Sequence, residues 1–591
     1  MTRRIRPSGC DGLSRVFTVI QGAPGIVPRR TFTMTERNAI AAGFLTHEVT
    51  NQPPPLEYDA WTTDTVLREV VAREGGGWAE ADLAKYGPVV GGEMQQLAFL
   101  ANENKPKFRP FDRYGNRRDE VEFHPAYHRL MELGMAHGVS GFAWRNEDKP
   151  GAHVARMALF YLHNQADNGT SCPLTMTYAS VPALRHQPEV AMEWLPRVSS
   201  ASYDSRFIPA AQKSGATIGM GMTEKQGGSD VRTNTTKAHR LGEGRGPGQP
   251  YALVGHKWFF SAPMSDAFLV LAHAEGGLSC FLMPRFTPDG ALNAIRVQRL
   301  KDKLGDWSNA SSEVELHGAY AVMVGAEGRG VPTILEMVAL TRQDCMIGSS
   351  GQMRQALVQA IHHTRHRVAF GKRLIDQPLM RNVLADLALE LEAHVALTGR
   401  VSRAVDATPR DEKEAAFCRI ATAVGKYWVC KRTPSFVNEA QECLGGAGYV
   451  EETNLPRLYR QAPLNSIWEG SGNIQCLDVL RAASREPASR EALFAELLAA
   501  QGGHPAYDEA TARLGKELAN TDSLEVRSRT IVEGLALALQ ASLLIRAGNT
   551  AVSDAFCESR LGGAHGQTFG TLPAHAPMQM LIERAFSEGA K

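Results

Sequence analysis

The sequence has few of the features that mark secreted, membrane or nucleic-acid-binding proteins. Its 591 residues include nine cysteines with no C-x-x-C pair, and an odd, dispersed set of this kind is typical of reduced thiols in a cytoplasmic protein. No uninterrupted apolar run approaches the ~18 residues that span a bilayer, so we expect no membrane partner. The 64 basic and 63 acidic residues nearly cancel, and the net charge therefore gives no reason to expect a nucleic-acid partner.

Two further absences narrow the choice of fold. No period of ~20–50 residues repeats, which excludes solenoid architectures. The chain also lacks the G-x-G-x-x-G motif of dinucleotide-binding folds. Its glycine-rich residues 242–248 contain Pro247, which breaks that spacing, and we interpret them as a loop between strands. What is present is 43% hydrophobic residues, which is ordinary for a globular chain and enough for a substantial core.

The first 45 residues differ in composition from the rest. Residues 1–30 hold six arginines against a single acid, Asp11, and their apolar stretch, residues 16–20, is short. A signal peptide needs a longer apolar core. We expect a basic, disordered leader over residues 1–45, with a nucleic-acid-binding arm as the alternative. An ordinary sequence begins at Met34, and we expect the true start there.

The periodicity of apolar residues changes twice along the chain. Residues 63–215 show the three- and four-residue spacing of amphipathic helices, whereas residues 218–324 contain short β-branched and aromatic runs that end in turn residues. These patterns predict helices followed by strands. Three long helical segments come next, at residues 333–367, 379–405 and 412–442. Long helices joined by short loops favour an antiparallel bundle.

We therefore predict a mostly α protein with a central β domain. The predicted domains are an N-terminal helical domain (46–217), a middle β domain (218–325), a helical bundle (326–484) and an extra C-terminal helical domain (485–591). This last region contains the pattern of three or four more amphipathic helices.

Three segments contain the residue types that ligand sites need. Residues 220–230 combine hydroxyl side chains with a glycine pair that lets a flat or anionic ligand approach the backbone; an ordinary turn is the alternative. Residues 442–449 end a long helix with glycines whose amides could receive a phosphate group. Residues 467–475 place Glu469 next to Trp468 in a glycine-rich bend that opens a helix.

Together these segments resemble the acyl-CoA dehydrogenase flavoprotein family. Residues 222–230 look like its first signature, residues 445–457 like its second, and residues 258–261 like the strand that lies against the flavin. Residues 367–386 are similar to the helix pair that reaches a neighbouring subunit's cofactor. The spacing matches over residues 221–481, and several independent motifs in one order make chance agreement very small.

A narrower resemblance points to the family's flavoproteins of the bacterial alkylation response. It runs from about residue 46 into the C-terminal helices and includes Lys225, Gln226 and residues 255–261, 301–311 and 463–481. The resemblance implies a homotetramer that binds FAD and dehydrogenates branched short acyl-CoA thioesters, such as isovaleryl-CoA, only weakly. It also implies protection of DNA against alkylation and association with double-stranded DNA.

The family resemblance implies an N-terminal helical domain, a β-barrel or sandwich and a helical bundle. It also implies which residues hold FAD, with Arg367 and the two glycines at 445 and 446 meeting the pyrophosphate from a partner chain. Arginine suits that task because its planar fork pairs with phosphate oxygens; a solvated helix arginine is the alternative. The implied FAD-binding residues are Met220, Gly221, Met222, Thr223, Ser229, Trp258, Phe259, Phe260, Ser261, Arg367, Phe370, Gly445, Gly446, Ile467, Trp468, Gly470, Asn473 and Leu477.

Glu469 occupies the position of the family's catalytic base, which removes the proton α to a thioester carbonyl. Apolar surroundings should raise its pKa and strengthen it as a base. The alternative is that Glu469 only caps the following helix. Arg481 follows Glu469 by 12 residues. If its guanidinium reaches the base it would lower the pKa of Glu469 and slow proton abstraction; a plain surface arginine is the alternative.

Two other patterns carry weaker expectations. His362 and His366 lie four residues apart on a predicted helix, but no nearby carboxylate or cysteine completes a metal site, so we predict no metal. Residues 482–591 contain ten basic and thirteen acidic residues, whereas phosphate binding favours clustered positive charge. DNA binding by this region is therefore the least supported of the inherited expectations.

The leading interpretation is an FAD-dependent acyl-CoA dehydrogenase-type flavoprotein of the alkylation response. One alternative is a metabolic acyl-CoA dehydrogenase with no role at DNA. The other is a DNA-shielding flavoprotein in which FAD is structural and Glu469 performs no chemistry. The sequence does not identify the acyl chain.

Overall fold

The computed structural model describes residues 46–587, which divide into two units at Gln52 and Pro53. The described residues of the first unit, 46–52, contain no helix or strand. Our expectations for the leader and for Met34 fall on residues 1–45, outside the described residues. All elements below belong to the second unit.

The N-terminal part of this unit is helical, as the periodicity predicts. Its first helix begins after Asp64, whose carboxylate accepts a hydrogen bond from the Leu67 amide at 2.9 Å and so caps the helix. The helices are α2 (Thr65–Arg73), α3 (Glu80–Gly91), α4 (Glu93–Glu103), α5 (Pro125–Ala136), α6 (Phe142–Arg145), α7 (Ala152–Ala166), α8 (Ser171–Arg185) and α9 (Pro188–Val198).

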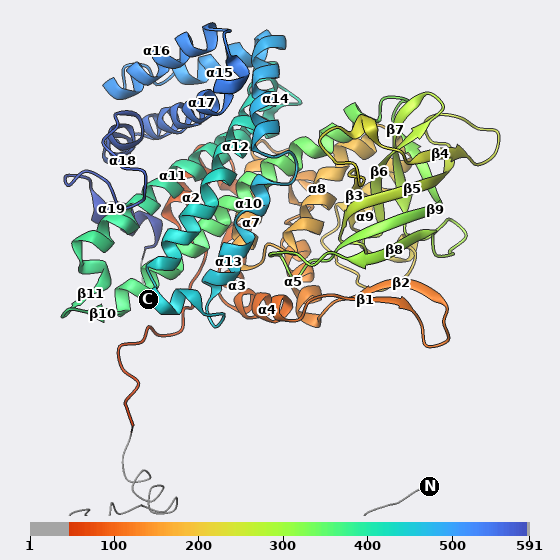
Figure 1. Cartoon of the computed structure of the whole chain (residues 1–591), viewed down its shortest axis with the longest axis horizontal. Coiled ribbons are helices and arrows are strands. Elements are labelled where there is room, and N and C mark those ends of the chain that lie inside the picture. Colours follow the sequence, from red (N-terminus) through yellow and green to blue (C-terminus); the bar gives the residue numbers. More distant parts are fainter. Residues whose placement is uncertain (1–45, 588–591) are drawn as a thin grey trace, which may run out of the picture. The chain divides into compact units, whose positions relative to one another are not determined.

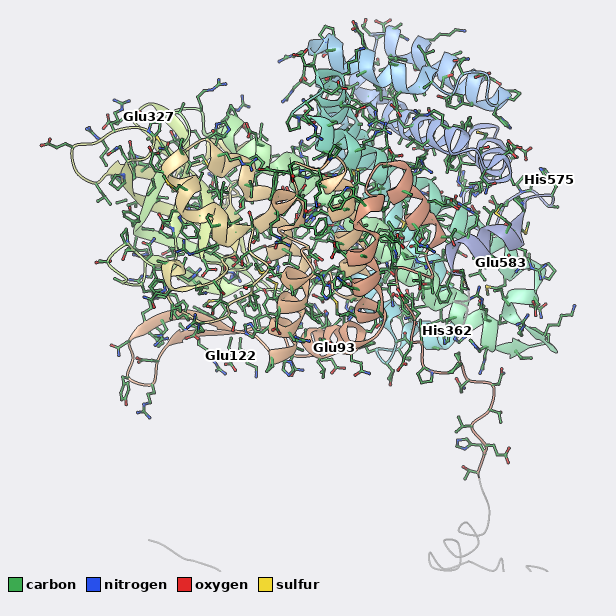
Figure 2. All side chains as sticks on the ribbon, turned by 180° about the vertical axis from the view of Figure 1, so that it is seen from behind. Glu93, Glu122, Glu327, His362, His575 and Glu583 are labelled. Atoms are coloured by element: carbon green, nitrogen blue, oxygen red, sulfur yellow. The ribbon has the colours of Figure 1, made fainter. Side chains whose placement is uncertain are left out.

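A β-hairpin interrupts these helices, and our expectation of a purely helical pattern over residues 63–215 was wrong there. Strands β1 (Lys107–Phe111) and β2 (Arg117–Glu122) pair in antiparallel register. Both strands are short, charged and half exposed, so they lack the apolar alternation that identifies a strand. One contact between the strands is polar: Arg109 Nε lies 2.9 Å from the carboxylate of Glu122, whose position Figure 2 shows.

The middle region forms a closed barrel beside helices α8 and α10 (Figure 1). The strand order β3-β6-β4-β5-β9-β7 is completed by pairing between β6 and β7, and β8 pairs with β9. Side chains that point inward, including Phe260, Phe268 and Phe281, fill the barrel. The predicted strands are therefore confirmed, and residues 242–248 lie in the loop between β4 and β5. The strands are β3 (Ile218–Gly221), β4 (Lys237–Arg240), β5 (Pro250–Ser261), β6 (Ala267–Ala274), β7 (Gly277–Pro284), β8 (Ile295–Leu300) and β9 (Ser311–Val324).

Three long helices follow the barrel, as predicted, and pack against one another: α10 (Gly330–His366), α11 (Pro378–Ala407) and α12 (Glu412–Glu442). A two-residue hairpin, β10 (Val368–Ala369) and β11 (Lys372–Arg373), separates the first two. Helices α13 (Asn454–Gln461) and α14 (Gly472–Arg485) complete this part. The bend between α13 and α14 contains Glu469.

The C-terminal region contains more helices than the three or four we expected. Five α-helices are described: α15 (Pro487–Leu498), α16 (Pro505–Ala519), α17 (Leu524–Ala547), α18 (Thr550–Phe556) and α19 (Met578–Ala585). They share one hydrophobic core with the N-terminal helices and the bundle. Helix α17 is long and apolar enough to cross a membrane by length and composition, but 61% of its most apolar window is buried inside the protein, as in a core helix.

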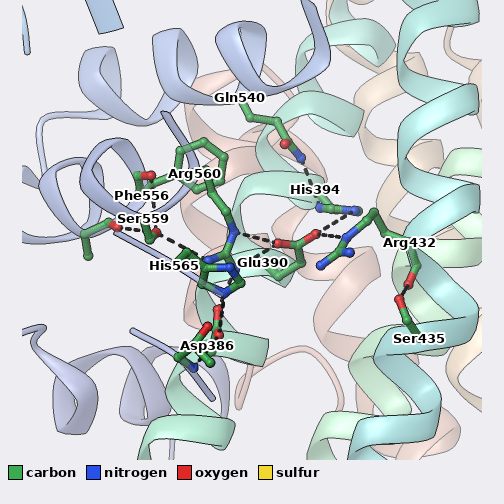
Figure 3. A network of polar contacts seen from close by, with 12 residues as sticks. Asp386, Glu390, His394, Arg432, Ser435, Gln540, Phe556, Ser559, Arg560 and His565 are labelled. Atoms are coloured by element: carbon green, nitrogen blue, oxygen red, sulfur yellow. Dashed lines mark hydrogen bonds and ion pairs between the residues drawn. The ribbon is translucent and has the colours of Figure 1, made fainter. Parts of the chain in front are cut away.

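Buried charges join this C-terminal region to the bundle (Figure 3). Glu390 on α11 accepts hydrogen bonds from Arg432 Nε at 2.7 Å and from Arg560 Nε at 3.1 Å. One turn away, Asp386 is paired with Arg560 and with His565. Three separate parts of the chain therefore meet at two carboxylates on one helix.

Candidate active site

A cavity of about 1980 Å³ lies between the barrel, helices α8 and α10, and the bend that joins α13 to α14. Two of the motifs, residues 220–230 and 467–475, contribute to its lining, and the third, residues 442–449, does not.

Glu469 lines this cavity at an unusual backbone position. Its φ is +56° and that of the following Gly470 is +91°. Left-handed geometry is costly for a residue with a side chain, and here it turns the chain sharply just before α14. The carboxylate accepts a hydrogen bond from Thr341 Oγ1 on α10 at 2.8 Å. The bend thus points the acid at α10 and the cavity.

Burial raises the pKa of Glu469 above the ordinary value of a glutamate. The Thr341 hydrogen bond and the charges of Lys426 and Arg342 oppose this effect without cancelling it. A carboxylate enclosed by protein, with its remaining surface toward a cavity, is a stronger base than one in water. No side-chain cap hydrogen bond is found at the start of α14, and the role of Glu469 as a base stays a prediction.

Charged side chains hold the bend in place, and our sequence reasoning missed them. Lys426 of α12 is buried, and its ammonium donates to the carbonyls of Asn465, Trp468 and Gly470 at 3.2, 2.8 and 2.7 Å. Arg342 Nε donates to the Glu469 carbonyl at 3.0 Å. No local motif marks these residues, because they lie 43 and 127 positions from Glu469 in sequence.

Arg481 also lines the cavity, but it is not the cation beside the base. The positive charges that act on Glu469 belong to Lys426 and Arg342. Arg342 in turn pairs with Asp478 of α14 at 3.0 Å. Our hypothesis that Arg481 lowers the pKa of Glu469 therefore has to be corrected. Two other cations lower it, Arg342 on α10 and Lys426 on α12.

The barrel wall of the cavity is anchored by a buried ion pair. Lys257 Nζ on β5 lies 2.9 Å from the carboxylate of Glu224, and both side chains are fully buried. Burial would raise the pKa of Glu224, but Lys257 and the Thr236 hydroxyl hold it well below the ordinary value. The loop is also tightly packed, since a Cβ on Gly228 would lie 2.3 Å from Thr223 Oγ1.

Three family models match the chain: the adaptive response protein AidB N-terminal domain over residues 51–205, the acyl-CoA dehydrogenase middle domain over 219–319, and the acyl-CoA dehydrogenase C-terminal domain over 328–484. The chain is 47% identical over 519 residues to AidB from Escherichia coli (strain K12), covering 87% of this chain and 94% of AidB. The chain belongs to the acyl-CoA dehydrogenase family.

Solved structures of two similar proteins extend the match in three dimensions. Caenorhabditis elegans ACDH-11 in complex with C11-CoA is 26% identical, with a TM-score of 0.80 over 93% of this chain and 99% of that one. The structure called Bd2924 apo-form is 30% identical, with a TM-score of 0.77 over 84% of this chain and 99% of that one. The predicted fold, helices around a central β domain with further C-terminal helices, is confirmed.

FAD is the cofactor of this family and of this protein, and the cavity walls fit a flavin. Phe259 leaves 53% of its surface exposed although it is apolar, so a flat aromatic ring would cover it favourably. Hydroxyl groups that could bond ring heteroatoms are those of Thr223, Ser229 and Ser261. The predicted cofactor residues that line the cavity are Met220, Met222, Thr223, Ser229, Phe259, Ser261, Ile467, Trp468, Gly470 and Leu477.

Three predicted cofactor residues on the barrel do not line the cavity. Phe260 is fully buried in the barrel core, and a Cβ on Gly221 would lie 2.8 Å from its ring. Side chains alternate along a strand, so Phe259 and Ser261 face the cavity and Phe260 faces away. An irregularity in the pairing of β5 between Lys257 and Phe260 leaves Trp258 under the ammonium of Lys301, 3.4 Å from its ring centroid.

Five other predicted cofactor residues lie away from the cavity lining. Asn473 accepts a hydrogen bond from Arg529 Nε of α17 at 2.9 Å. Phe370 is fully exposed with φ +52°, and a Cβ on Gly445 or Gly446 would meet no atom. Arg367 ends helix α10 beside the β10–β11 hairpin. That some of these residues serve a neighbouring subunit's cofactor remains a prediction.

The histidines of α10 make contacts other than metal ligation. His362, labelled in Figure 2, has its Nε2 atom 2.8 Å from the Pro54 carbonyl, and His366 Nδ1 lies 2.8 Å from the carbonyl of His362. No group of three metal-ligating side chains is found among residues 46–587.

Proposed function

We propose that this protein is an FAD-dependent acyl-CoA dehydrogenase with weak activity on branched short acyl-CoA thioesters of the isovaleryl-CoA type. The observation that carries the proposal is Glu469: an enclosed carboxylate with a raised pKa, on the wall of a cavity that the family's cofactor fits. Support for the substrate class comes from the C11-CoA complex of ACDH-11.

In this proposal Glu469 removes the proton from the carbon α to the thioester carbonyl. Bound FAD would supply the acceptor for the hydride that leaves the β-carbon. Thr341 orients the carboxylate through its 2.8 Å hydrogen bond. Lys426 and Arg342 hold the bend at its carbonyls, so the base stays in position without a direct ion pair that would weaken it.

The direct test is anaerobic mixing of the FAD-loaded protein with isovaleryl-CoA. We expect the flavin absorbance to bleach slowly, and a dye acceptor to be reduced in steady state. If the protein retains flavin but neither signal appears with any acyl-CoA, the alternative of a structural FAD with an idle Glu469 is favoured instead.

We further propose that the protein acts in the cytoplasm in the response to DNA alkylation and associates with double-stranded DNA. Support comes from the match to the adaptive response protein N-terminal domain and from the 47% identity to AidB. The acidic excess of residues 482–591 speaks against that region as the DNA surface.

A gel-shift titration over a range of salt concentrations tests this second proposal. Phosphate contacts predict affinity that falls steeply as salt rises. Absence of any shift at low salt, together with isovaleryl-CoA activity, would favour the metabolic dehydrogenase without a DNA role.

We propose a homotetramer as the assembly. Support comes from apolar side chains that are strongly exposed near the β10–β11 hairpin and after α12: Phe370 is 100%, Tyr449 is 85% and Leu379 is 83% exposed. Contact with another chain would remove this apolar surface from water, which is favourable. Light scattering of the FAD-loaded protein should give four times the chain mass, and substitution of Phe370 by Ser should reduce it.

A further inference from the structure

A second carboxylate, Asp306, lines the same cavity as Glu469 and has no role in the proposed reaction. It lies in the loop between β8 and β9, is only 4% exposed and has φ +51°. Its side chain makes no hydrogen bond and no ion pair within the described part of the chain, and its Oδ1 atom is buried without a partner. Buried polar groups of this kind are uncommon and need an explanation.

The neighbours of Asp306 do not satisfy it. The ammonium of Lys303 donates to the carbonyl of Asn309 at 2.9 Å, and the side-chain oxygen of Asn309 is itself buried without a partner. Burial raises the pKa of Asp306 to about 6, with the charge of Lys303 opposing the rise. One short loop of the cavity wall therefore holds a partly buried cation and two side-chain oxygens that no described group bonds.

The loop is too constrained to relieve this by moving. A Cβ on Gly305 would lie 2.8 Å from the carbonyl of Arg460, so the backbone is in close contact with α13. Trp307 Nε1 donates to the Lys303 carbonyl at 2.8 Å, and the Arg460 guanidinium lies 4.2 Å from the Trp307 ring centroid. Both faces of the loop are thus held, and the position of Asp306 is built into the fold.

Helix α8 contributes a lining residue that relates Asp306 to the predicted base. Cys172 of α8, another lining residue, is close enough to Lys303, Asp306 and Glu469 for all three charges to act on its thiol. The predicted base and the unpartnered carboxylate therefore both lie near the same lining residue of α8. A ligand that reaches Glu469 with its reacting carbons can extend past Cys172 toward Asp306.

We propose that Asp306 and Lys303 form a binding site for a polar group on the acyl chain of the substrate. This inference rests on the proposed dehydrogenase function. A hydroxyl or a primary amide suits the site, because each can donate a hydrogen bond to the Asp306 carboxylate and accept one from the Lys303 ammonium. A plain alkyl chain would leave the buried carboxylate unpaired, which is costly.

Binding without turnover provides the test. In the FAD-loaded Glu469→Gln protein, binding is followed by the change in the flavin spectrum. The probes are ω-hydroxyacyl-CoA thioesters of increasing length and the alkyl thioesters that have a methyl group in place of each hydroxyl. We expect one hydroxyl thioester to bind more tightly than its alkyl partner. Adding Asp306→Asn should weaken that thioester by about tenfold, as for loss of a charged hydrogen bond, and leave the alkyl partner unchanged.

Asn keeps the shape of Asp306 and tolerates positive φ, so the variant should fold. Lys303→Met is the second variant, with the same expected loss, and Asp148→Asn is the control because Asp148 is exposed and does not line the cavity. Equal binding of both thioester series in every variant would overturn the inference. The inference would also be overturned if the Asp306 variant lost FAD and bound the hydroxyl and alkyl thioesters equally less tightly. That result would show that Asp306 contacts the cofactor. Flavin reduction by isovaleryl-CoA in the otherwise unmodified protein reports separately on the proposed function.

Discussion

Glu469 and Glu390 are both glutamates enclosed by the protein, yet their surroundings have opposite effects. Glu469 has one hydroxyl partner for its carboxylate, and burial raises its pKa. Burial also acts on Glu390, but Arg432 and Arg560 outweigh it and hold the pKa of that carboxyl well below its ordinary value. Burial alone therefore does not determine what a carboxylate can do.

The difference lies in where the nearby cations direct their hydrogen bonds. At the junction in Figure 3, two guanidinium groups donate directly to the Glu390 carboxylate. At the cavity, Lys426 and Arg342 donate to backbone carbonyls of the bend instead. Basic side chains thus stabilise an anion at one site and position the proposed proton acceptor at the other.

The largest expected effect comes from removing the proton acceptor. Glu469→Gln should slow flavin reduction by isovaleryl-CoA by about 10²–10⁴-fold, the usual contribution of a general base, because no other described carboxylate is bonded to Thr341. Stopped-flow spectroscopy measures the rate. Glu452→Gln, at an exposed position, is the control. An unchanged rate in the Glu469→Gln protein would exclude Glu469 as the base.

At the junction the largest effect should be on stability. Arg560→Leu leaves Glu390 and Asp386 buried with fewer partners, and breaking such a pair typically costs about 3–5 kcal/mol. Denaturant unfolding measures the loss, and Arg513→Leu on the exposed face of α16 is the control. Similar stability for both variants would show that the network contributes little.

The contribution of Glu390 to stability should depend on pH in the acidic range. Because the pKa of Glu390 is lower in the folded state than its ordinary value of 4.5, ionised Glu390 stabilises the fold at pH values above 4.5. This stabilisation is lost as the pH falls from 4.5 toward the lower pKa of the folded state. Glu390→Gln should therefore be less stable than the unmodified protein near neutral pH and lose less stability on acidification. Unfolding free energies across acidic pH test this, and parallel curves would contradict it.

The smallest expected effect is a shift in the pH dependence of the reaction when the hydrogen bond to Glu469 is removed. Thr341→Val removes the hydrogen bond that lowers the pKa of Glu469, so the pKa should rise further. The base is active only when deprotonated, and the acidic limb of the rate profile should move to higher pH. Thr341→Ser should restore the original profile. A profile unaffected by Val would mean that a different group titrates.

Local patterns predicted much of this architecture. The bounds of α10, α11 and α12 lie within a few residues of the apolar periodicity that predicted them, because amphipathic spacing is a local property. The hairpin β1–β2 was missed because both strands are short and β2 contains a single apolar residue, Val121. Its stability comes from partners far along the chain, such as the Val297 carbonyl that accepts a hydrogen bond from Arg117 at 2.8 Å.

The parts of the site that are local in sequence were also predictable. Glu469, Trp468 and the 220–230 loop are found by motif, whereas Thr341, Arg342 and Lys426 come from helices whose local sequence shows no functional feature. The assignment of Phe260 to the cofactor ignored strand alternation, which places its side chain in the barrel core. The domain boundaries and the cofactor contacts of a neighbouring subunit remain predictions.

The left-handed backbone at Glu469 has a consequence for how this enzyme could change under selection. Glycine or asparagine would adopt φ +56° with less strain, and either would also remove an enclosed acid. Replacing the proposed base with either residue should therefore raise the melting temperature of the protein. Such a trade-off between durability and activity means that a lineage freed from the need for dehydrogenation would gain stability by discarding its base, while keeping its flavin and its fold.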